Sequence, residues 1–530
     1  MDIIARAMAE KLHICEDAWL KEQTWESFRK QSSGKKLFIF GAGGGLEYFL
    51  RNCCDHMKIE GVVDNDKRKH SLKLGWGSVE AWSTEYEEIV IDSPDILQQY
   101  KQHDIVVLIT AVNGYEFMIE QLRGMGIVKP FVLLMLEVNR RGRAVISLEK
   151  DYEERKKEYI EWCCEQKLQE NKIVMRIAEY GGHARCITTQ LLKSGKKLDI
   201  VWLVQTPHIE IPQGVRRINE KNWKAYYYEM ETAKIWIFDV TIPEEVIKRN
   251  DQIYIQTKHW SSITLKKFYL EDKSSCTSPQ IEARIRKDGK RMDYLLSGSE
   301  FDEESCRRGL AFTGRAVHVG SPRSDILFDC SVRKKVLLAF GLEEETHILL
   351  YAPTYRKYDH ENGRGMKLSL DLDKLSEALK RKWKGNWVVL IRLHPWISFE
   401  KSGLQETEIV LNAGDYPDSE ELVSGCDVMI TDYSSIMFEG AYIKKPVFLY
   451  SQDRNEYIDG ERGLLLDYNT LPFPIAESND ELSYCIQNFN KEQYEEDVMK
   501  FLKEYGVNED GHASERAAAF ILDLLCKKDI

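Results

Sequence analysis

The stretch Asp427-Val-Met-Ile-Thr-Asp-Tyr-Ser-Ser-Ile-Met-Phe-Glu439 decides the fold of this chain. Its apolar residues 428–430 predict a buried central strand, and Ser434 or Ser435 then caps the helix that follows. The first N–H groups of a helix are unpaired and the helix dipole favours an anion, so this turn can hold a phosphate. An ordinary strand-to-helix turn with a serine cap has the same pattern.

Length and composition predict several folded domains. At 530 residues, with 43% hydrophobic and 30% charged residues, the chain is long enough for about three domains. The net charge of −12 argues against nucleic-acid binding by the whole surface, although a local basic groove is compatible with it. Twelve cysteines occur without the paired spacing of a zinc site, which favours a reducing cytoplasm and predicts no metal site. Residues 1–30 do not resemble a signal peptide, and no stretch approaches ~20 uninterrupted apolar residues, so we expect neither secretion nor a membrane span.

The first part of the chain has the pattern of a small Rossmann-like domain over 32–148, preceded by a helical lead-in over 1–31. Strands are predicted at 37–40, 59–63, 105–109 and 131–136. Glycines allow a tight turn at a helix start, and an acidic residue about 20 positions later can bind ribose hydroxyls. A possible nucleotide site therefore consists of Gly41, Gly43, Gly45 and Asp64. Leu46 stands where the full glycine pattern has its last glycine, and an interaction domain that lost its ligand is the alternative.

Two larger α/β domains are predicted after a connecting segment. The segment 149–170 mixes acids and bases with aromatic residues at helical spacing, which indicates a solvated linker helix. Strand-like runs then recur at 172–177, 199–204, 234–238, 252–256 and 316–319, and again at 348–352, 387–393, 427–430 and 447–450. This alternation predicts α/β doubly wound, Rossmann-like domains over 171–320 and 321–530, whose ligands bind at the carboxyl ends of the strands.

Anion-binding side chains follow several of these strands. Arg392 and His394 lie at the end of one strand, Thr354 and Arg356 follow another, and Arg462 lies in a later loop. A guanidinium can bind two phosphate oxygens at once, so the grouping predicts a pyrophosphate site between the two domains. Singly, such an arginine more often pairs with a surface carboxylate.

Two further side chains are candidates for the same site. Glu439 lies one helical turn beyond Ser435, where its carboxylate could bind ribose hydroxyls. His259 follows the strand 252–256 in the other domain, where an imidazole can take a proton from an alcohol at neutral pH. A histidine that only ends the strand is the alternative.

Five ordered motifs resemble those of the CDP-glycerol glycerophosphotransferase family, the teichoic acid polymerases and primases of Gram-positive bacteria. The motifs, which lie within the 170–530 span of the resemblance, are Gly320-Ser-Pro-Arg-Ser-Asp325, Tyr351-Ala-Pro-Thr-Tyr-Arg356, Arg392-Leu-His-Pro395, Thr431-Asp-Tyr-Ser-Ser-Ile-Met-Phe-Glu439 and Glu461-Arg-Gly463. The resemblance implies a GT-B pair of domains. It also implies transfer of glycerol phosphate or ribitol phosphate from a CDP-polyol to a hydroxyl of a lipid-linked or growing polymer, with release of CMP and no required metal or cofactor.

The resemblance also implies roles for individual residues. His259 is similar to the family's acceptor-side base and His394 to its second essential histidine beside the donor pyrophosphate. The remaining donor-binding candidates are Arg323, Thr354, Arg356, Arg392, Asp432, Ser434, Ser435, Glu439 and Arg462.

The chain departs from the family pattern at three places. The family's Trp-His-Gly-Thr-Pro is replaced by Lys258-His259-Trp260-Ser261-Ser262, which bears on acceptor identity, and its Pro-Gly-Pro by Pro472-Phe-Pro474, which predicts a stiffer loop. The extra N-terminal domain resembles those fused to surface-polysaccharide enzymes, so capsule or glycan decoration is an alternative to wall teichoic acid synthesis.

Two other functions stay open from the sequence. One is a GT-B glycosyltransferase that uses a nucleotide sugar for capsule or surface polysaccharide, and the other is a non-catalytic nucleotide-sensing scaffold. The lipid-linked acceptor of the family implies a cytoplasmic protein on the inner face of the plasma membrane. Residues 380–384, with Trp383 and Trp387, are the best membrane-contact candidate, and a solvated helix end is the alternative.

Overall fold

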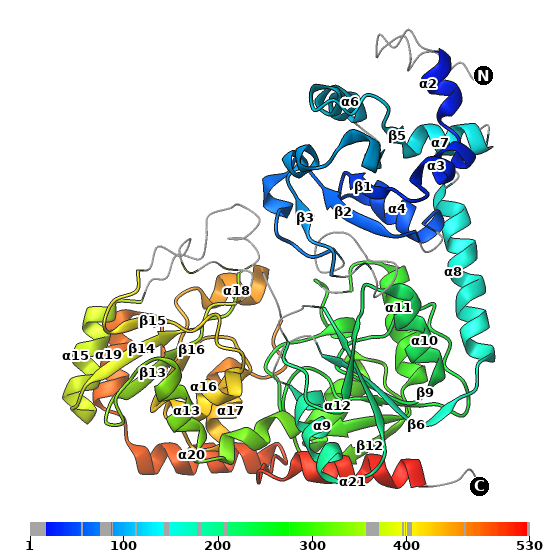
Figure 1. Cartoon of the computed structure of the whole chain (residues 1–530). Helices are drawn as coiled ribbons and strands as arrows, with labels where there is room; N and C mark the ends of the chain where they lie inside the picture. The colour runs from blue at the N-terminus through cyan, green and yellow to red at the C-terminus, as the bar shows by residue number, and fades with distance from the viewer. Residues whose placement is uncertain are drawn as a thin grey trace.

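The computed structural model contains three parallel sheets in one chain (Figure 1). It describes residues 17–54, 57–74, 86, 88–111, 114–141, 148–177, 182–205, 209–274, 276–356, 370–394, 397, 399, 405–460 and 463–526. We call the sheets N-terminal, middle and C-terminal by their order in the chain. All described strand pairs within them are parallel, as expected where helices connect successive strands.

The N-terminal sheet has the strand order β3-β2-β1-β4-β5, with the chain crossing from β2 and β3 on one side of β1 to β4 and β5 on the other. Its strands are β1 (Lys36–Phe40), β2 (Ile59–Val63), β3 (Ile91–Asp92), β4 (Ile105–Ile109) and β5 (Phe131–Val132). Its helices are α2 (Asp17–Glu22), α3 (Trp25–Ser32), α4 (Gly44–Asn52), α6 (Tyr115–Gly124) and α7 (Leu133–Arg141), with short 3-10 turns η1 (Lys67–Lys69), η2 (Pro94–Gln99) and η3 (Gln102–Asp104).

The predicted strand over 131–136 is wrong in its second half. The strand ends at Val132, and helix α7 begins at Leu133. Leu133 and Leu136 are three residues apart and both belong to one buried cluster, so the apolar run has helical spacing. A short apolar run is compatible with either structure, which is why the sequence pattern misassigned it.

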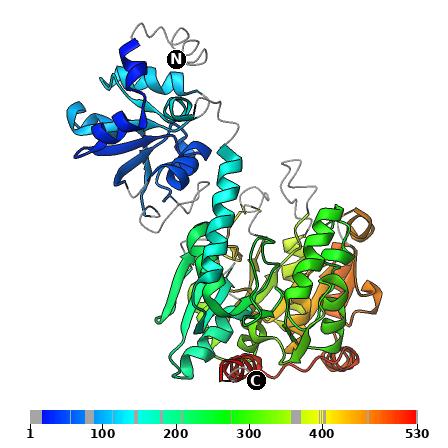
Figure 2. The same ribbon diagram turned by 90° about the vertical axis from the view of Figure 1, so that its right-hand side faces the viewer.

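Helix α8 (Leu148–Glu165) connects the N-terminal sheet to the rest of the molecule (Figures 1 and 2). The helix was predicted, but it is not solvated on all sides. Ile160 is buried in the middle-sheet core, and the Tyr159 ring meets that of Trp223 edge to face at 5.4 Å. Both views place the N-terminal sheet at one end of the molecule and the last helix at the opposite end.

The middle sheet has seven strands in the order β12-β11-β10-β9-β6-β7-β8. They are β6 (Gln169–Ile177), β7 (Asp199–Val204), β8 (Val215–Asn219), β9 (Ala233–Phe238), β10 (Ile253–Gln256), β11 (Tyr294–Ser297) and β12 (Arg315–His318). The helices are α9 (His183–Lys193), α10 (Trp223–Thr232), α11 (Pro279–Arg291) and α12 (Glu300–Gly309), with the turn η5 (Tyr269–Glu271). Strands β7 and β9 lie in the interior of the sheet and are almost wholly buried, which explains their nearly continuous apolar sequences.

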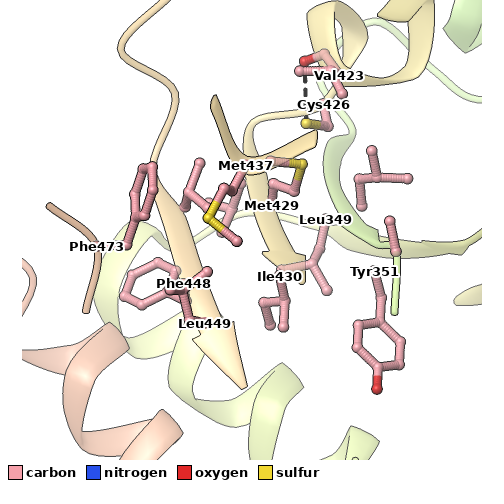
Figure 3. Close-up of a cluster of buried hydrophobic side chains, with 14 of the residues drawn as sticks. Leu349, Tyr351, Val423, Cys426, Met429, Ile430, Met437, Phe448, Leu449 and Phe473 are labelled. Carbon is pink, nitrogen blue, oxygen red and sulfur yellow. Dashed lines mark hydrogen bonds between the residues drawn. The ribbon is translucent and has the colours of Figure 1, made fainter. Parts of the chain in front are cut away.

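The C-terminal sheet has six strands in the order β15-β14-β13-β16-β17-β18. They are β13 (His347–Tyr351), β14 (Trp387–Ile391), β15 (Val410–Asn412), β16 (Val428–Thr431), β17 (Val447–Tyr450) and β18 (Ile475–Ala476). The helices are α13 (Val332–Ala339), α15 (Leu372–Trp383), α16 (Ser419–Gly425), α17 (Ile436–Tyr442), α18 (Arg454–Gly460), α19 (Asn479–Gln487), α20 (Lys491–Glu504) and α21 (Ala513–Cys526), with turns η6 (Pro322–Phe328) and η8 (Tyr468–Thr470). Figure 3 shows the core around β16, where Met429 and Ile430 pack with Leu349 of β13 and Phe448 of β17.

The last helix leaves the C-terminal sheet and packs on the middle sheet. Ala517, Ala518, Ile521 and Leu524 of α21 belong to the same buried cluster as β6 and β7. Asp325 holds the start of this helix, because its carboxylate accepts hydrogen bonds from the backbone N–H groups of Ala513 (2.9 Å) and Ser514 (2.7 Å). The predicted domain limits of 171–320 and 321–530 stay a prediction. Helix α21 falls within the second range by sequence but packs on the sheet of the first.

None of the helices in the described residues is long and apolar enough to cross a lipid bilayer. Residues 380–384, the membrane-contact candidate, lie at the end of α15. The ring of Trp383 packs on protein there, with its centroid 5.8 Å from that of Phe489 and 5.9 Å from that of Trp387.

The contact between α8 and the middle sheet should depend on pH through Glu231. This buried carboxyl accepts hydrogen bonds from the N–H of Ile247 (2.9 Å) and the thiol of Cys164 (3.3 Å), and burial raises its pKa to about 7. The folded protein therefore keeps a proton that the unfolded chain releases above its ordinary pKa of 4.5. Stability should fall as pH rises through this window, by about 3 kcal/mol relative to Glu231→Gln.

Melting temperatures of both proteins from pH 4.5 to 7 test this dependence. The wild-type value should fall relative to that of Glu231→Gln as the pH rises, whereas Glu161→Gln, an exposed position on α8, should follow the wild type. Parallel curves for wild type and Glu231→Gln would contradict the assignment.

Candidate functional site

Three adjacent strands of the C-terminal sheet end at the same level. Tyr351 of β13 pairs with Ile391 of β14 on one side and with Ile430 of β16 on the other. The residues after these strands therefore lie along one edge, which brings together Thr354, His394 and Asp432. His394 is exposed there, and its ring lies 5.2 Å from that of Tyr355.

His259 lies on the loop after β10, the corresponding edge of the middle sheet. Its side chain is exposed, while both neighbours, Lys258 and Trp260, are buried. The backbone of Lys258 has a left-handed φ of 52°, which is uncommon for a residue with a Cβ atom. This reversal carries the chain from the strand end to the exposed position of His259.

The loop after β10 contacts the serine turn of the C-terminal sheet directly. The Ser435 hydroxyl accepts a hydrogen bond from the Leu265 N–H (3.1 Å) and lies 3.1 Å from the hydroxyl of Thr264. The Ser261 hydroxyl lies 2.9 Å from that of Tyr442 at the end of α17. The loop that carries His259 and the stretch that opened the sequence analysis are therefore joined in the folded chain.

The same loop also pairs with the segment after Arg462. The Lys267 N–H donates to the carbonyl of Gly463 (2.9 Å), and the Leu465 N–H donates to that of Leu265 (2.8 Å). Arg462 itself, a predicted donor-binding residue, lies outside the described residues, as does Pro395 of the Arg-Leu-His-Pro motif.

Arg323 connects the two domains through a buried network. Its Nε donates to Oε1 of Glu420 (2.8 Å), its Nη1 donates to the carbonyl oxygen of His259 (2.7 Å), and its Nε lies 3.7 Å from Oε1 of Glu439. The Arg323 side chain is only 17% exposed. It thus holds the backbone of His259, and the donor-binding role predicted for it stays a prediction.

Burial and charge set the protonation of the carboxyls around Arg323. Burial alone raises the pKa of Glu420, but the positive charge of Arg323 outweighs it and lowers the pKa. Burial, together with the nearby charge of Glu420, raises the pKa of Glu439 well above its usual range. Burial and the neighbouring carboxylate of Glu420 thus favour the protonated form of Glu439. Its carboxyl is buried against protein, so binding of ribose hydroxyls by this residue also stays a prediction.

Asp432 and Arg356 bind each other and the loop after β13. Asp432 Oδ1 accepts from the N–H groups of Thr354 (2.8 Å) and Tyr433 (2.6 Å), and its Oδ2 accepts from Arg356 Nη2 (2.9 Å). Arg356 also donates to both oxygens of Asp453, at 2.7 and 3.1 Å. These bonds shape the strand ends, and a direct phosphate contact by either side chain stays a prediction.

The two serines of the turn have different partners. Ser434 Oγ accepts from the N–H of Ile436 at the first turn of α17 (3.4 Å), whereas Ser435 is bonded to the loop after β10. The hydroxyl of Thr354 is buried and makes no hydrogen bond within the described residues. Arg392 Nη1 donates to the carbonyls of Ala413 (3.0 Å) and Tyr416 (2.6 Å), which turns the side chain toward the loop after β15.

The predicted N-terminal nucleotide site is packed closely. Asp64 Oδ2 accepts from the N–H of Ala42 (2.7 Å) and from Lys69 Nζ (3.0 Å), so the acid binds the glycine turn itself. Gly41 has φ +112°, and a Cβ at Gly45 would lie 1.7 Å from the carbonyl oxygen of Thr110, which explains both glycines by backbone geometry. Gly43 is the N-cap of α4. Nucleotide binding by these residues stays a prediction.

Within the described residues, no group of three or more histidine, cysteine, aspartate or glutamate side chains is arranged to hold a metal ion.

Three residues of the site were missed from the sequence. His183 Nε2 donates to the carbonyl of Trp260 (2.9 Å), and Glu509 accepts from the hydroxyl of Ser262 and from the N–H of Ser321 (3.1 Å). Glu420 pairs with Arg323 from 97 residues away. The two glycines before His183 are a local pattern from which this residue could have been predicted. The sequence around Glu420 and Glu509 contains no such pattern.

Comparison with known proteins places most of the chain in one family. Residues 159–523 match the family model described as CDP-Glycerol:Poly(glycerophosphate) glycerophosphotransferase. A teichoic acid poly(glycerol phosphate) polymerase of Staphylococcus epidermidis is 28% identical over 344 residues, which cover 62% of this chain and 46% of that protein. One of Bacillus spizizenii is 25% identical over 356 residues, which cover 65% of this chain and 89% of that protein.

A solved structure of the wall teichoic acid polymerase TagF has the same fold. It superposes with a TM-score of 0.62 at 23% identity, covering 72% of this chain and 96% of that one. The likeness supports the predicted GT-B fold of the middle and C-terminal sheets. The chain spans about half the length of the Staphylococcus epidermidis relative, and residues before 159 lie outside the family match.

Loss of Arg323 should destabilise the protein strongly. Arg323→Met leaves the buried carboxylate of Glu420 without its positive partner, for which we expect a loss of about 3–5 kcal/mol. Arg307→Met is the matched control, because Arg307 forms an ion pair with Glu303 but is 40% exposed, and its loss should cost less than about 1 kcal/mol. Denaturant unfolding compares the two, and equal losses would contradict a central role of Arg323.

Proposed function

The chain belongs to the CDP-glycerol:poly(glycerophosphate) glycerophosphotransferase family, and we propose that it transfers a polyol phosphate from a CDP-polyol to a hydroxyl group. The polyol phosphate is glycerol phosphate or ribitol phosphate, the acceptor is a cell-surface glycan or a teichoic-acid-like polymer, and CMP is released. One observation carries the proposal: the loop with His259 is hydrogen-bonded to the Ser435 turn, beside the strand ends with Thr354 and His394.

We assign the acceptor side of the reaction to His259. The imidazole takes the proton of the acceptor hydroxyl, whose oxygen attacks the β-phosphorus of the CDP-polyol. A new bond forms between that oxygen and phosphorus, and the bond from phosphorus to the CMP oxygen breaks in line with it. Histidine suits this step because its imidazole titrates near neutral pH.

The donor side is assigned to the edge of the C-terminal sheet. His394, Arg392, Ser434, Thr354 and the undescribed Arg462 are proposed to bind the diphosphate and to stabilise the charge that develops on it. Arg392 is included although its Nη1 also donates to the carbonyls of Ala413 and Tyr416, because it directly follows a strand of this edge. The unpaired hydroxyl of Thr354 and the exposure of His394 support this assignment.

The remaining donor-binding candidates act as support in this proposal. Arg323, Arg356, Asp432, Ser435 and Glu439 direct their polar atoms toward protein groups, which holds the strand ends and the His259 loop in place. Such prior positioning lowers the barrier, because the groups that stabilise the transition state need not reorganise.

We further propose that transfer needs no metal or other cofactor, with the CDP-polyol as the donor substrate. Guanidinium and imidazole groups would provide the positive charge that a metal ion provides elsewhere. Activity that survives EDTA treatment would support this, and activity that EDTA abolishes and Mg²⁺ restores would contradict it.

The proposed place of action is the cytoplasmic face of the plasma membrane, with peripheral attachment. The lipid-linked acceptors implied by the family resemblance support this location. Sedimentation of the protein with vesicles of anionic lipid, compared with neutral vesicles, tests the attachment.

Replacement of His259 should abolish transfer without unfolding the protein. We expect His259→Ala to lower kcat at least ~100-fold, since a general base contributes that much or more. CMP release from CDP-glycerol and CDP-ribitol, measured with a lipid-linked acceptor, reads out the loss. His512→Ala is the control, because this histidine is exposed and has no part in the proposed reaction, so its loss should leave kcat unchanged.

The same assay separates this function from its alternatives. Full activity of His259→Ala would show that the base assignment is wrong. Transfer from UDP-sugars with no use of CDP-polyols would indicate a glycosyltransferase, and donor binding without any turnover would indicate a sensing scaffold.

A further inference from the structure

We infer that the carboxylate of Asp302 is a positioning group for His259, because it binds the residues on both sides of that histidine. The inference rests on the proposed function and extends it to a residue that lies outside the five motifs. Asp302 lies in the first turn of α12, 43 positions along the chain from His259.

On one side of His259, Asp302 holds Lys258 by a buried ion pair. Lys258 Nζ lies 2.5 Å from Asp302 Oδ2 and also donates to the carbonyl of Leu296 at 3.2 Å. The two side chains are 1% and 0% exposed. The pair anchors the residue whose left-handed φ of 52° reverses the chain, so the side chain stabilises an unfavourable backbone conformation.

On the other side, the same carboxylate holds Trp260. The indole Nε1 donates to Asp302 Oδ1 at 3.0 Å, and the indole ring packs at 4.2 Å from the ring of Phe268. The His259 ring meets the Trp260 ring edge to face at 4.9 Å. The wall against which the imidazole packs is therefore itself fixed by Asp302.

Asp302 is held rigidly enough for this role. Its carboxylate also accepts from the hydroxyl of Ser297 (3.1 Å) and the N–H of Gly298 (3.2 Å), and its own N–H donates to Ser299 Oγ (3.0 Å). A carboxylate in the first turn of a helix is further stabilised by the helix dipole. Both carboxylate oxygens of Asp302 are therefore held by hydrogen bonds.

The backbone between the two anchors is bound as well. The carbonyl of His259 accepts from Arg323 (2.7 Å) and that of Trp260 from His183 (2.9 Å). In this chain Trp260, Ser261 and Ser262 stand where the family pattern has Gly-Thr-Pro. Here side-chain bonds set the path of the loop on both sides of the exposed His259.

A buried ion pair can also serve stability alone, and the chain offers a matched pair for comparison. Lys172 of β6 and Glu229 of α10 lie 2.8 Å apart, with 1% and 7% exposure, in the same domain. After loss of the lysine, Glu229 retains Arg216, at 2.7 Å, and Asp302 retains Trp260, Ser297 and Gly298. Glu229 keeps the positive charge of Arg216, whereas Asp302 keeps only neutral donors, so Lys258→Met should cost more stability than Lys172→Met. Lys172→Met therefore controls for loss of a buried lysine ion pair in the same domain, and kcat rather than stability separates the two variants.

The test measures kcat, KM for the CDP-polyol and the melting temperature of Lys258→Met, Trp260→Phe, Asp302→Asn and Lys172→Met. We expect both lysine variants to lose melting temperature, Lys258→Met the more. Only Lys258→Met should lose kcat, by roughly tenfold, with KM within about twofold of wild type, because misplacement of a reacting group slows the chemical step. Trp260→Phe, which removes the indole donor and reduces the size of the ring, should also lower kcat. These two variants carry the test if Asp302→Asn does not fold.

Wild-type kcat in Lys258→Met and Trp260→Phe, or an equal loss of kcat in Lys172→Met, would overturn the inference. Hydrogen–deuterium exchange of residues 255–265 provides a second readout that needs no substrate. Faster exchange of these residues in Lys258→Met, and not in Lys172→Met, would support the positioning role. This holds even if the wild type transfers nothing from CDP-polyols, a result that would contradict the proposed function alone. Unchanged exchange in Lys258→Met would contradict positioning.

Discussion

The arrangement of the site depends on one buried guanidinium. Arg323 comes from the segment between the middle and C-terminal sheets, binds Glu420 of the C-terminal domain and donates to the carbonyl of His259 on the middle-sheet loop. Because two buried charges are stable only when paired closely, the two domains cannot separate here without exposing or orphaning them. The position of His259 relative to the strand ends of the other sheet follows from that pairing.

Other contacts between the domains reinforce this constraint from both sides. Asp325, two residues after Arg323, holds the start of α21, which then packs on the middle sheet. Arg185 of α9 pairs with Asp418 at 2.5 Å, and the loop after β10 bonds to Ser435. The Gly320–Asp325 motif is thus part of the joint between the two domains. The family resemblance implies a donor contact for Arg323, which stays a prediction, and the hydrogen bonds of Arg323 in the structure hold the loop that carries His259.

The core of the fold could be predicted because buried parallel strands have a strong local pattern. Strands at 59–63, 105–109, 199–204 and 447–450 are confirmed with the predicted bounds. The strands β3, β8, β11, β15 and β18 were missed, since they are short or lie toward the sheet edges. The run 131–136 failed for the opposite reason, because an apolar sequence fits a buried helix as well as a buried strand.

The sequence by itself determined which polar residues follow which strands. It therefore predicted that Thr354, His394 and Ser434 lie along one edge of the C-terminal sheet, and that His259 lies at an edge of the middle sheet. Local composition is enough for that, because polar residues after a buried apolar run mark a strand end. Only the tertiary structure decided which of those polar groups are already bound to protein, such as Arg356 to Asp432 and Arg323 to Glu420. The physical reason is that ion pairs and hydrogen bonds between distant segments depend on positions in space, and spacing along the chain contains no information about them.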